Sequence, residues 1–544
     1  MFHHICQYWP TARQLLIYCG AGNNGGDGYV IAALARQAGW AVQLVQVGDL
    51  ARATPETQRA VRFASDAGVV VVSWRDYVTA GSAGSAGEAE GLSQSGSGVI
   101  VDALLGTRLH GALRGDYAHA VDMINASSWP VMAADVPSGL SSDYGTVESC
   151  AVRAALTVTV VGRKPGLYTG VAADYVGRLV FEPLADADEW QQASCDQVQP
   201  CARLVTADLL SEWVPARART AHKGHYGQVL VVGGDVGMGG AAILAAQAAA
   251  RTGAGKTVLM SRAEHLPVML VRQPEVMTIA VADARAESAA IAAQVRAATV
   301  VVLGPGLGQS AWSRTLFDAV IKEAVHASVP LVLDADALNL LAEDLVGKGR
   351  GGKLAGAELS GAELSEATLA ELDKASRARW ILTPHPGEAA RLLGKTTAEI
   401  QSDRYHAVRQ LQQLTGANCL LKGAGSLMAF SELASKLASK LASKPSRQSI
   451  APLAGLVDVC ADGNPGMASG GMGDVLAGIA GGLLAQGLSA ADALRAAVCA
   501  HARAADLAVV QQGEQGLLAS DLLPELTRLW SELDSAPRSS APGY

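Results

Sequence analysis

Glycines directly before an aspartate are the strongest chemical signal in this sequence. Residues 470–473 read Gly-Gly-Met-Gly and precede Asp474 at the start of an apolar, helix-like stretch. Free N–H groups in a first helical turn bind anions, and a carboxylate beside them can accept a proton from a hydroxyl that attacks phosphorus. A second glycine-rich turn, Lys422-Gly-Ala-Gly-Ser426, follows an expected strand. Together the two turns predict a phosphate-binding site with a general base.

A second group of polar residues lies near the N-terminus. Residues 20–28 read Gly-Ala-Gly-Asn-Asn-Gly-Gly-Asp-Gly, and five glycines in nine positions leave the backbone free to approach a phosphate. Asp102 and Asp135 end two further expected strands, and Ser138 follows the second. Because open α/β sheets bind ligands at the carboxyl ends of their strands, we expect these groups to converge. Carboxylate, amide and hydroxyl oxygens are typical ligands of a hard cation.

Alternating strands and helices must position both groups. β-branched runs followed by Ala- and Leu-rich helical patterns predict βαβ units and parallel sheets. Expected strands lie at 15–19, 41–46, 98–103, 130–135 and 155–161, then from 228 and at 257–261, 299–303, 330–334, 379–383 and 417–421. This pattern lapses between about 185 and 220. We therefore divide the chain into a domain at 1–190, a linker at 191–220 and a domain at 221–542.

Composition excludes several classes of protein. The chain has 544 residues, a formal net charge of −8 and 17% charged residues, which argues against binding to nucleic acid or to an anionic membrane. The most apolar stretch, Val475 to Ala485, is too short to span a bilayer, and the first residues do not resemble a signal peptide. Eight scattered cysteines without a C-x-x-C pair indicate a reducing compartment. We expect a cytoplasmic enzyme with no nucleic-acid or membrane partner.

Three stretches interrupt the strand and helix pattern. Residues 81–98 are rich in Gly, Ser and Ala, 346–365 contain a doubled Gly-Ala-Glu-Leu-Ser, and 433–444 repeat Leu-Ala-Ser-Lys three times. Surface loops tolerate extra length at low cost in free energy, and none of these stretches carries a chemical motif. We expect solvated loop insertions.

The first half resembles the NAD(P)H-hydrate epimerase domain of the bifunctional NAD(P)H-hydrate repair enzymes. Its motifs Gly-Asn-Asn-Gly-Gly-Asp-Gly, Val-Asp-Ala-Leu-Leu-Gly-Thr, Asp-Val-Pro-Ser-Gly and Lys-Pro-Gly-Leu occur in the family's order. The resemblance implies a Rossmann-like three-layer domain in which Asp135 and Lys164 are catalytic. The residues it implies for the hydrated nucleotide are Asn23, Asn24, Gly25, Gly26, Asp27, Gly106, Thr107, Arg108, Leu109, His110, Gly111, Ala112 and Asp135, and those for potassium are Asn24, Asp102 and Ser138.

The second half resembles the ADP-dependent NAD(P)H-hydrate dehydratase, which has a ribokinase-like α/β fold. The resemblance rests on Gly304-Pro-Gly-Leu-Gly308, Leu333-Asp-Ala-Asp-Ala-Leu-Asn339, Thr383-Pro-His-Pro-Gly-Glu388 and the two glycine-rich turns. It implies that Asp474 is the base. The residues implied to contact the hydrate are Ala241, Gly306, His385 and Asp474, and those implied to hold the adenine nucleotide are Lys422, Gly423, Ala424, Gly425, Ser426 and Gly473.

The two resemblances together imply a bifunctional metabolite-repair enzyme, an isomerase joined to a lyase. The first domain would interconvert the R and S hydrates of NADH or NADPH. The second would dehydrate the S hydrate with ADP as co-substrate, giving AMP and phosphate. Potassium and Mg²⁺ are the implied ions, and we expect a homo-oligomer.

Two other functions stay open at the level of sequence. The Gly-x-Gly-Asp element also occurs in small-molecule kinases, such as vitamin or sugar kinases. The first domain could also serve only as a nucleotide-binding or interaction module. Only 14 residues precede the first expected strand, fewer than the family has there, so we expect weak, potassium-stimulated epimerase activity.

Overall fold

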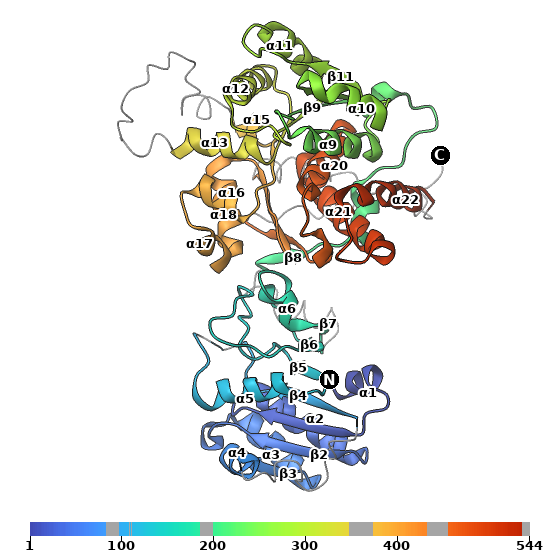
Figure 1. Cartoon of the computed structure of the whole chain (residues 1–544). Helices are drawn as coiled ribbons and strands as arrows, with labels where there is room; N and C mark the ends of the chain where they lie inside the picture. The colour runs from blue at the N-terminus through green and yellow to red at the C-terminus, as the bar shows by residue number, and fades with distance from the viewer. Residues whose placement is uncertain are drawn as a thin grey trace. The chain divides into compact units, whose positions relative to one another are not determined.

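The chain forms two compact units, Met1–Gln199 and Pro200–Tyr544 (Figure 1). The computed structural model describes residues 1–82, 97–107, 109, 111–184, 200–346, 374–431 and 455–535. Most of 81–98, nearly all of 346–365 and all of 433–444, the expected insertions, lie outside the described residues, as do Arg108 and His110. Within the described ranges, no helix combines the length and apolar character needed to cross a bilayer.

The first unit is built on a seven-stranded parallel sheet in the order β3-β2-β1-β4-β5-β6-β7. The order reverses between β1 and β4, the point at which open α/β sheets bind ligands. The α/β fold with parallel strands expected from the sequence is confirmed. The elements are α1 (Phe2–Tyr8), β1 (Gln14–Cys19), α2 (Asn23–Gln37), β2 (Ala41–Gln46), α3 (Pro55–Asp66), β3 (Val70–Ser73), α4 (Trp74–Ser82), β4 (Gly98–Ala103), α5 (Gly115–Ala126), β5 (Val131–Ala134), β6 (Leu156–Val160), α6 (Ala173–Val176) and β7 (Arg178–Glu182).

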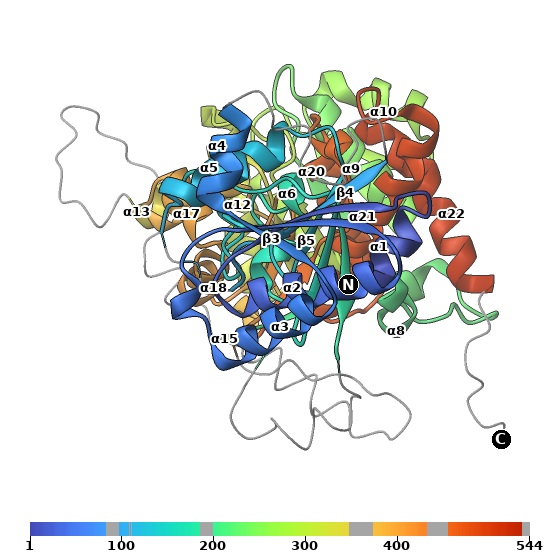
Figure 2. The ribbon, with the colours of Figure 1, turned by 90° about the horizontal axis from the view of Figure 1, so that it is seen from below.

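Helices cover both faces of this sheet, as Figure 2 shows with α2 and α3 on one side and α4 and α5 on the other. Because side chains alternate along a strand, β1 contributes to both cores. Leu15 and Ile17 pack in the cluster that contains buried residues of α1, α2 and α3. Tyr18 belongs to the cluster on the α4 and α5 side. The strand ends are thus held between two cores.

The second unit has a ten-stranded sheet in the order β11-β10-β9-β12-β13-β14-β15-β16-β17-β8. The strands from β11 to β15 are parallel, whereas β16 runs antiparallel to both neighbours. The strands are β8 (Ala202–Leu204), β9 (Gln228–Val232), β10 (Lys256–Ser261), β11 (Met277–Ala280), β12 (Val300–Leu303), β13 (Leu331–Leu333), β14 (Ile381–Leu382), β15 (Asn418–Leu421), β16 (Ser426–Ala429) and β17 (Val457–Cys460). The helices are α8 (Leu210–Trp213), α9 (Gly239–Thr252), α10 (Leu266–Arg272), α11 (Ser288–Ala297), α12 (Ala311–His326), α13 (Asp336–Val346), α15 (Lys374–Arg377), α16 (Pro386–Leu393), α17 (Thr397–Ser402), α18 (Arg404–Thr415), α20 (Met472–Ala485), α21 (Ala490–Gln512) and α22 (Leu522–Ser535).

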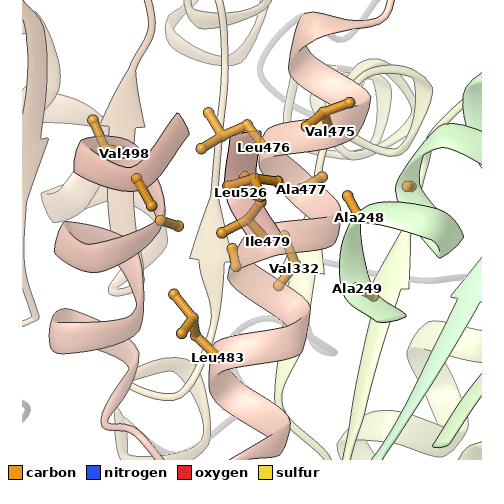
Figure 3. Close-up of a cluster of buried hydrophobic side chains, with 14 of the residues drawn as sticks. Ala248, Ala249, Val332, Val475, Leu476, Ala477, Ile479, Leu483, Val498 and Leu526 are labelled. Atoms are coloured by element: carbon orange, nitrogen blue, oxygen red, sulfur yellow. The ribbon is translucent and has the colours of Figure 1, made fainter. Parts of the chain in front are cut away.

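One buried helix, α20, anchors the core of this unit. Nearly all its residues are buried, and it packs against α9 with Ala248 and Ala249 facing it (Figure 3). The two helices approach closely because Gly478 has no side chain, since a Cβ there would lie 2.2 Å from the carbonyl oxygen of Ala245. This packing fixes the N-terminus of α20, where the glycine-rich turn and Asp474 lie.

The stretch assigned to a linker at 191–220 needs a correction. Its described part, from residue 200, contains β8, which pairs with β17 in parallel, and α8. Arg203 in β8 also forms an ion pair with Asp458 in β17, with 2.6 Å between Nη2 and Oδ2. These residues belong to the second unit, because backbone pairing and a mostly buried ion pair hold them on its sheet.

Candidate active sites

Two positions in the turn after β1 of the first unit have no room for a side chain and therefore require glycine. A Cβ on Gly20 would lie 1.9 Å from the carbonyl oxygen of Leu104, and one on Gly25 would lie 1.9 Å from the carbonyl oxygen of Gly20. The turn therefore packs directly against the residue that follows β4. Helix α2 begins after Gly22, which has no side chain to cap its first N–H groups, so these remain available to an anion.

A buried carboxylate and hydroxyl lie at the ends of the two neighbouring strands. Asp102 is fully buried and accepts hydrogen bonds from the Ser138 hydroxyl at 2.7 Å and from the Ser138 N–H at 2.8 Å. Burial raises the pKa of Asp102 to about 6, although these bonds oppose the shift. The Ser138 oxygen also accepts from the Leu105 N–H at 2.9 Å. This pair ties the turn after β4 to the turn after β5.

Asp135 adopts a left-handed backbone conformation, with a φ of 67°. Such a conformation is uncommon for a residue with a side chain and is often kept where it aims a functional group. The carboxylate forms an ion pair with Lys164, accepts from the Thr159 hydroxyl at 3.2 Å, and is mostly buried. Lys164 also donates to the carbonyl oxygen of Val160 at 2.6 Å. A fixed carboxylate–ammonium pair can assist proton transfer in either direction.

Gly106 lies between Asn24 and this carboxylate. A Cβ on Gly106 would be 3.4 Å from the Asn24 Cβ and 3.6 Å from the Asp135 Oδ2. Desolvation and the charge of Asp135 raise the pKa of Asp27 to about 6, which brings this carboxylate into the same group. The structure therefore brings Asn24, Asp27, Gly106 and Asp135 together.

Other residues implied for the hydrate lie further out. The Asn23 side chain is exposed and its Oδ1 accepts a hydrogen bond from the Thr54 hydroxyl at 2.6 Å. Gly26 is buried in the first turn of α2. The loop between β4 and α5 carries four further described positions, of which Thr107 and Gly111 are exposed and Leu109 and Ala112 are partly buried.

The side chain of Asn24 fits the potassium ion that the resemblance implies. The residue is 8% exposed, and neither its Oδ1 nor its Nδ2 has a hydrogen-bond partner among the described residues. A buried amide without partners is costly unless a ligand completes it. Its oxygen, the Asp102 carboxylate and the Ser138 hydroxyl are donors that suit a hard cation.

In the second unit, three strand ends meet the N-terminus of α20. Lys422 follows β15 and donates to the Asp334 carboxylate at 2.7 Å, and the Thr383 hydroxyl donates to the same oxygen at 2.8 Å. A Cβ on Gly473 would lie 3.1 Å from the Lys422 Nζ and 3.3 Å from the Asp334 Oδ2. The glycine before Asp474 is therefore the point where the lysine and its carboxylate contact α20.

The charges around Asp474 prepare it to accept a proton near neutral pH. Burial, followed by the negative charge of Asp334, raises the pKa of Asp474 to about 7, while Lys422 acts in the opposite direction. The carboxylates of Asp334 and Glu388 in turn raise the pKa of Lys422, although its burial opposes them. A general base is most effective when its pKa lies near the working pH.

The start of α20 also offers an anion site. Its N-cap, Gly471, has a φ of 91° and lacks a side chain that could occupy the N–H groups of the first turn. The helix is 14 residues long and its N-terminal N–H groups carry a partial positive charge. This site and the base are adjacent because both lie on one helical turn.

The residues implied to contact the hydrate in this unit fall into two places. A Cβ on Gly306 would lie 3.1 Å from the Ala241 Cβ, so the turn after β12 meets the first turn of α9 at these two residues. His385 precedes α16, and its Nδ1 accepts from the Gly387 N–H at 2.9 Å. Burial and the charge of Lys422 lower the pKa of His385, which favours the neutral form of its ring.

Two acidic residues of this site had no role in the sequence interpretation. Asp334 ends β13, and Glu388 lies three residues after His385, whose backbone N–H it accepts at 2.8 Å. Burial raises the pKa of Glu388 to about 7. Both lie inside motifs quoted above. Asp334 directly follows the buried strand β13, and this position was the signal that could have identified it, whereas Glu388 lies in the first turn of α16 and had no such signal.

His501 was also missed, and it leads to a prediction about stability. It lies on α21, is 7% exposed, and burial lowers its pKa from 6.5 to about 4. In the unfolded chain His501 therefore binds a proton below pH 6.5, whereas in the folded chain it binds one only below about pH 4. The contribution of the neutral His501 to the free energy of unfolding is fully present above pH 6.5 and is lost as the pH falls toward 4. The total loss is about 3 kcal/mol.

We expect His501→Gln to lose less stability than the wild type on acidification. The measurement is the free energy of unfolding of the second unit, obtained from urea denaturation of both proteins at about pH 7 and about pH 4.5. A pH dependence that is the same in both proteins would show that His501 is not the responsible group.

The described residues contain no group of three His, Cys, Asp or Glu side chains that could hold a metal ion. Asp334, the most buried carboxylate of the second site, is already bound by Lys422 and Thr383. The described side chains of this site therefore do not form a cage for the Mg²⁺ expected with the nucleotide.

Comparison with known proteins identifies relatives of both units. Residues 1–166 match the family described as YjeF-related protein N-terminus, and residues 229–351, 364–444 and 425–528 match the family described as NAD(P)H-hydrate dehydratase. The chain is 39% identical over 531 residues to the bifunctional NAD(P)H-hydrate repair enzyme Nnr of Coxiella burnetii, covering 96% of this chain and 92% of that protein. It is 36% identical over 528 residues to the Escherichia coli enzyme of the same name, covering 96% and 86%.

A solved structure is similar to the second unit. It is the ADP/ATP-dependent NAD(P)H-hydrate dehydratase of Bacillus subtilis, co-crystallised with ATP and Mg²⁺. The likeness has 24% sequence identity and a TM-score of 0.44, and it covers 61% of this chain and 99% of that one.

Proposed function

This chain belongs to the family of bifunctional NAD(P)H-hydrate repair enzymes, and we propose that its two units are the epimerase and the dehydratase of that repair. The first unit interconverts the R and S hydrates of NADH or NADPH. The second removes water from the S hydrate in a nucleotide-dependent reaction and returns NADH or NADPH. The juxtaposition of Asp474, Lys422 and the N-terminus of α20 is the observation that supports this reaction best.

The chemistry of dehydration explains why a nucleotide is needed. Hydroxide is a poor leaving group, so the hydroxyl of the hydrate is first phosphorylated. Asp474 takes the proton of this hydroxyl while its oxygen attacks the β-phosphorus of ADP, and AMP leaves. The C–O bond then breaks, phosphate departs with its electron pair, and the lone pair of the ring nitrogen forms an iminium with the carbon that carried the hydroxyl. Loss of a proton to water from the adjacent ring carbon forms the new C=C bond and returns the lone pair to the nitrogen.

Residues around the base have defined tasks in this reaction. The N–H groups at the start of α20 and the ammonium of Lys422 stabilise the charge that develops on the transferred phosphoryl group. Asp334 holds Lys422 in place and helps to raise the pKa of Asp474. The turn from Lys422 to Ser426 holds the adenine nucleotide, and Ala241, Gly306 and His385 contact the hydrate.

A small-molecule kinase would use the same glycine-rich turn and base. The reactions differ in the fate of the phosphate, since a kinase releases its phosphorylated product intact. Family membership over nearly the whole chain supports dehydration over that alternative.

In the first unit, the Asp135–Lys164 pair supports epimerisation. The carbon that carries the hydroxyl also bears the ring nitrogen, so the hydrate is a hemiaminal and its C–O bond can open and close from either face. Asp135 and Lys164 exchange the protons that this opening and closing require. Potassium would be held by Asn24, Asp102 and Ser138, and its positive charge would attract the negatively charged groups of the nucleotide.

The proposal predicts how dehydration depends on pH. Asp474 acts as a base only when deprotonated, and its pKa is about 7, so kcat/KM should rise roughly tenfold per pH unit below about pH 7 and level off above it. Asp334→Asn removes the neighbouring negative charge and should shift this limb to lower pH.

The assay is recovery of the reduced-nicotinamide absorbance from S-NADPH hydrate with saturating ADP. Absence of ADP should stop the recovery. Recovery that proceeds equally well without any nucleotide would contradict the proposed function, and a flat profile between pH 6 and 8 would contradict the role of Asp474.

A further inference from the structure

A buried arginine lies beneath the glycine-rich turn that follows β15. Arg404 opens α18 and is 1% exposed. Its Nη1 donates to the Gln401 side chain at 2.7 Å. Its Nη2 lies 3.4, 3.2 and 3.4 Å from the carbonyl oxygens of Leu421, Lys422 and Gly425. One guanidinium therefore contacts the turn both before and after Gly423.

The charge of this arginine is retained despite its burial. Burial lowers the pKa of Arg404 to about 10, which leaves the guanidinium protonated at neutral pH. Burying a charge is costly unless dipoles and hydrogen bonds compensate it, and an apolar side chain would fill the same space without that cost. The carbonyl groups of the turn supply part of this compensation, so the charge and the conformation of the turn depend on each other.

The contacts also determine which way the turn presents its N–H groups. In a trans peptide the C=O and the next N–H point in opposite directions. Because the Lys422 carbonyl faces Arg404, the Gly423 N–H faces away from it. Gly423 has a φ of 138°, and a Cβ there would lie 2.9 Å from the Arg404 Nη2. The glycine thus allows the turn to close over the guanidinium with its carbonyls inward.

We propose that Arg404 is a positioning residue for the adenine nucleotide. It holds the carbonyls of residues 421, 422 and 425 inward, so that the Gly423 N–H and the Lys422 ammonium stay toward the phosphates. The positive charge beneath the turn adds to the attraction for an anion above it. This inference rests on the proposed function of the turn in binding nucleotide.

The test compares Arg404→Met with Arg409→Met, a matched control on the same helix. Arg409 also donates to backbone carbonyls, those of Cys201 at 3.0 Å and Gly455 at 3.2 Å, but it does not contact the turn through these bonds. We expect Arg404→Met to raise the Kd for ADP, measured by calorimetry, by about tenfold or more. The KM for S-NADPH hydrate at saturating ADP should stay within about twofold of wild type, and Arg409→Met should change neither constant.

Two further variants keep the test decisive if Arg404→Met does not fold. Arg404→Lys retains the charge, but one ammonium cannot serve Gln401 and the turn together, so its Kd for ADP should lie between those of wild type and Arg404→Met. Gln401→Ala removes the second anchor of the guanidinium and should also weaken ADP binding.

An unchanged Kd for ADP in the folded Arg404 variants would overturn the inference, as would an equal rise in the constants for ADP and hydrate. Calorimetry needs no turnover, so the two proposals can fail separately. A wild-type protein that binds ADP but does not dehydrate the hydrate would contradict the proposed function alone.

Discussion

Asp474→Asn is expected to lower kcat of the dehydratase by about 10²- to 10⁴-fold while ADP still binds. Asparagine has nearly the same shape as aspartate and leaves the N-terminus of α20 intact, so the anion site remains. It cannot accept the proton of the attacking hydroxyl. The measurement is steady-state turnover of S-NADPH hydrate together with calorimetric titration of ADP.

The matched control is Asp492→Asn on α21. Asp492 is the third residue of its helix, as Asp474 is of α20, and it bonds Ser489 and Arg495 away from the site. This variant should turn over like the wild type. If Asp474→Asn retained more than about a tenth of wild-type kcat, Asp474 would not be the base.

Asp135→Asn is expected to reduce epimerisation by about 10²-fold or more, because it removes both the proton acceptor and the ion pair with Lys164. The rate is measured as the supply of S hydrate from pure R hydrate to an excess of separate dehydratase, with and without potassium. Spontaneous epimerisation, measured without the protein, sets the lower limit.

The same molecule contains its own control for this variant. Dehydration of S hydrate by the second unit should be unchanged in Asp135→Asn. Asp174→Asn, an exposed residue in α6 of the first unit, should leave both activities intact. Equal epimerisation by wild type and Asp135→Asn, with or without potassium, would leave the first unit only a binding role.

The sequence predicted the interior strands of both sheets except β16 and β17, and it missed all the edge strands. The four edge strands are β3 and β7 in the first sheet and β11 and β8 in the second. In β3 none of the four residues is buried, and β11 has the same property. A continuous apolar run predicts a strand that is covered on both faces. Strands β7, β8 and β11 contain polar residues and lack such a run, whereas β3 reads Val-Val-Val-Ser, has the run and was still missed.

The sites show a similar division. The glycine-rich motifs identified three positions where a Cβ would lie close to backbone or side-chain atoms, namely Gly20, Gly25 and Gly473. Such close contacts are visible in the sequence because they require glycine. The contacts of Asp334 with Lys422 and of Arg404 with the turn join residues that are far apart or on different elements. Spacing along the chain does not determine such contacts, because they depend on how the strands are ordered in the sheet.

The central claim is that the hydroxyl of the hydrate leaves as part of the phosphate. The most direct measurement uses S-NADPH hydrate labelled in this hydroxyl with the heavy oxygen isotope, incubated with ADP and the Asp135→Asn protein, in which epimerisation, and with it exchange of this hydroxyl with water, is slowed. If the hydroxyl oxygen attacks phosphorus and the C–O bond then breaks, one labelled oxygen appears in each released phosphate, with AMP formed in equal amount. Label found in water instead, with unlabelled phosphate, would mean that ADP is hydrolysed beside the reaction, and it would contradict the account.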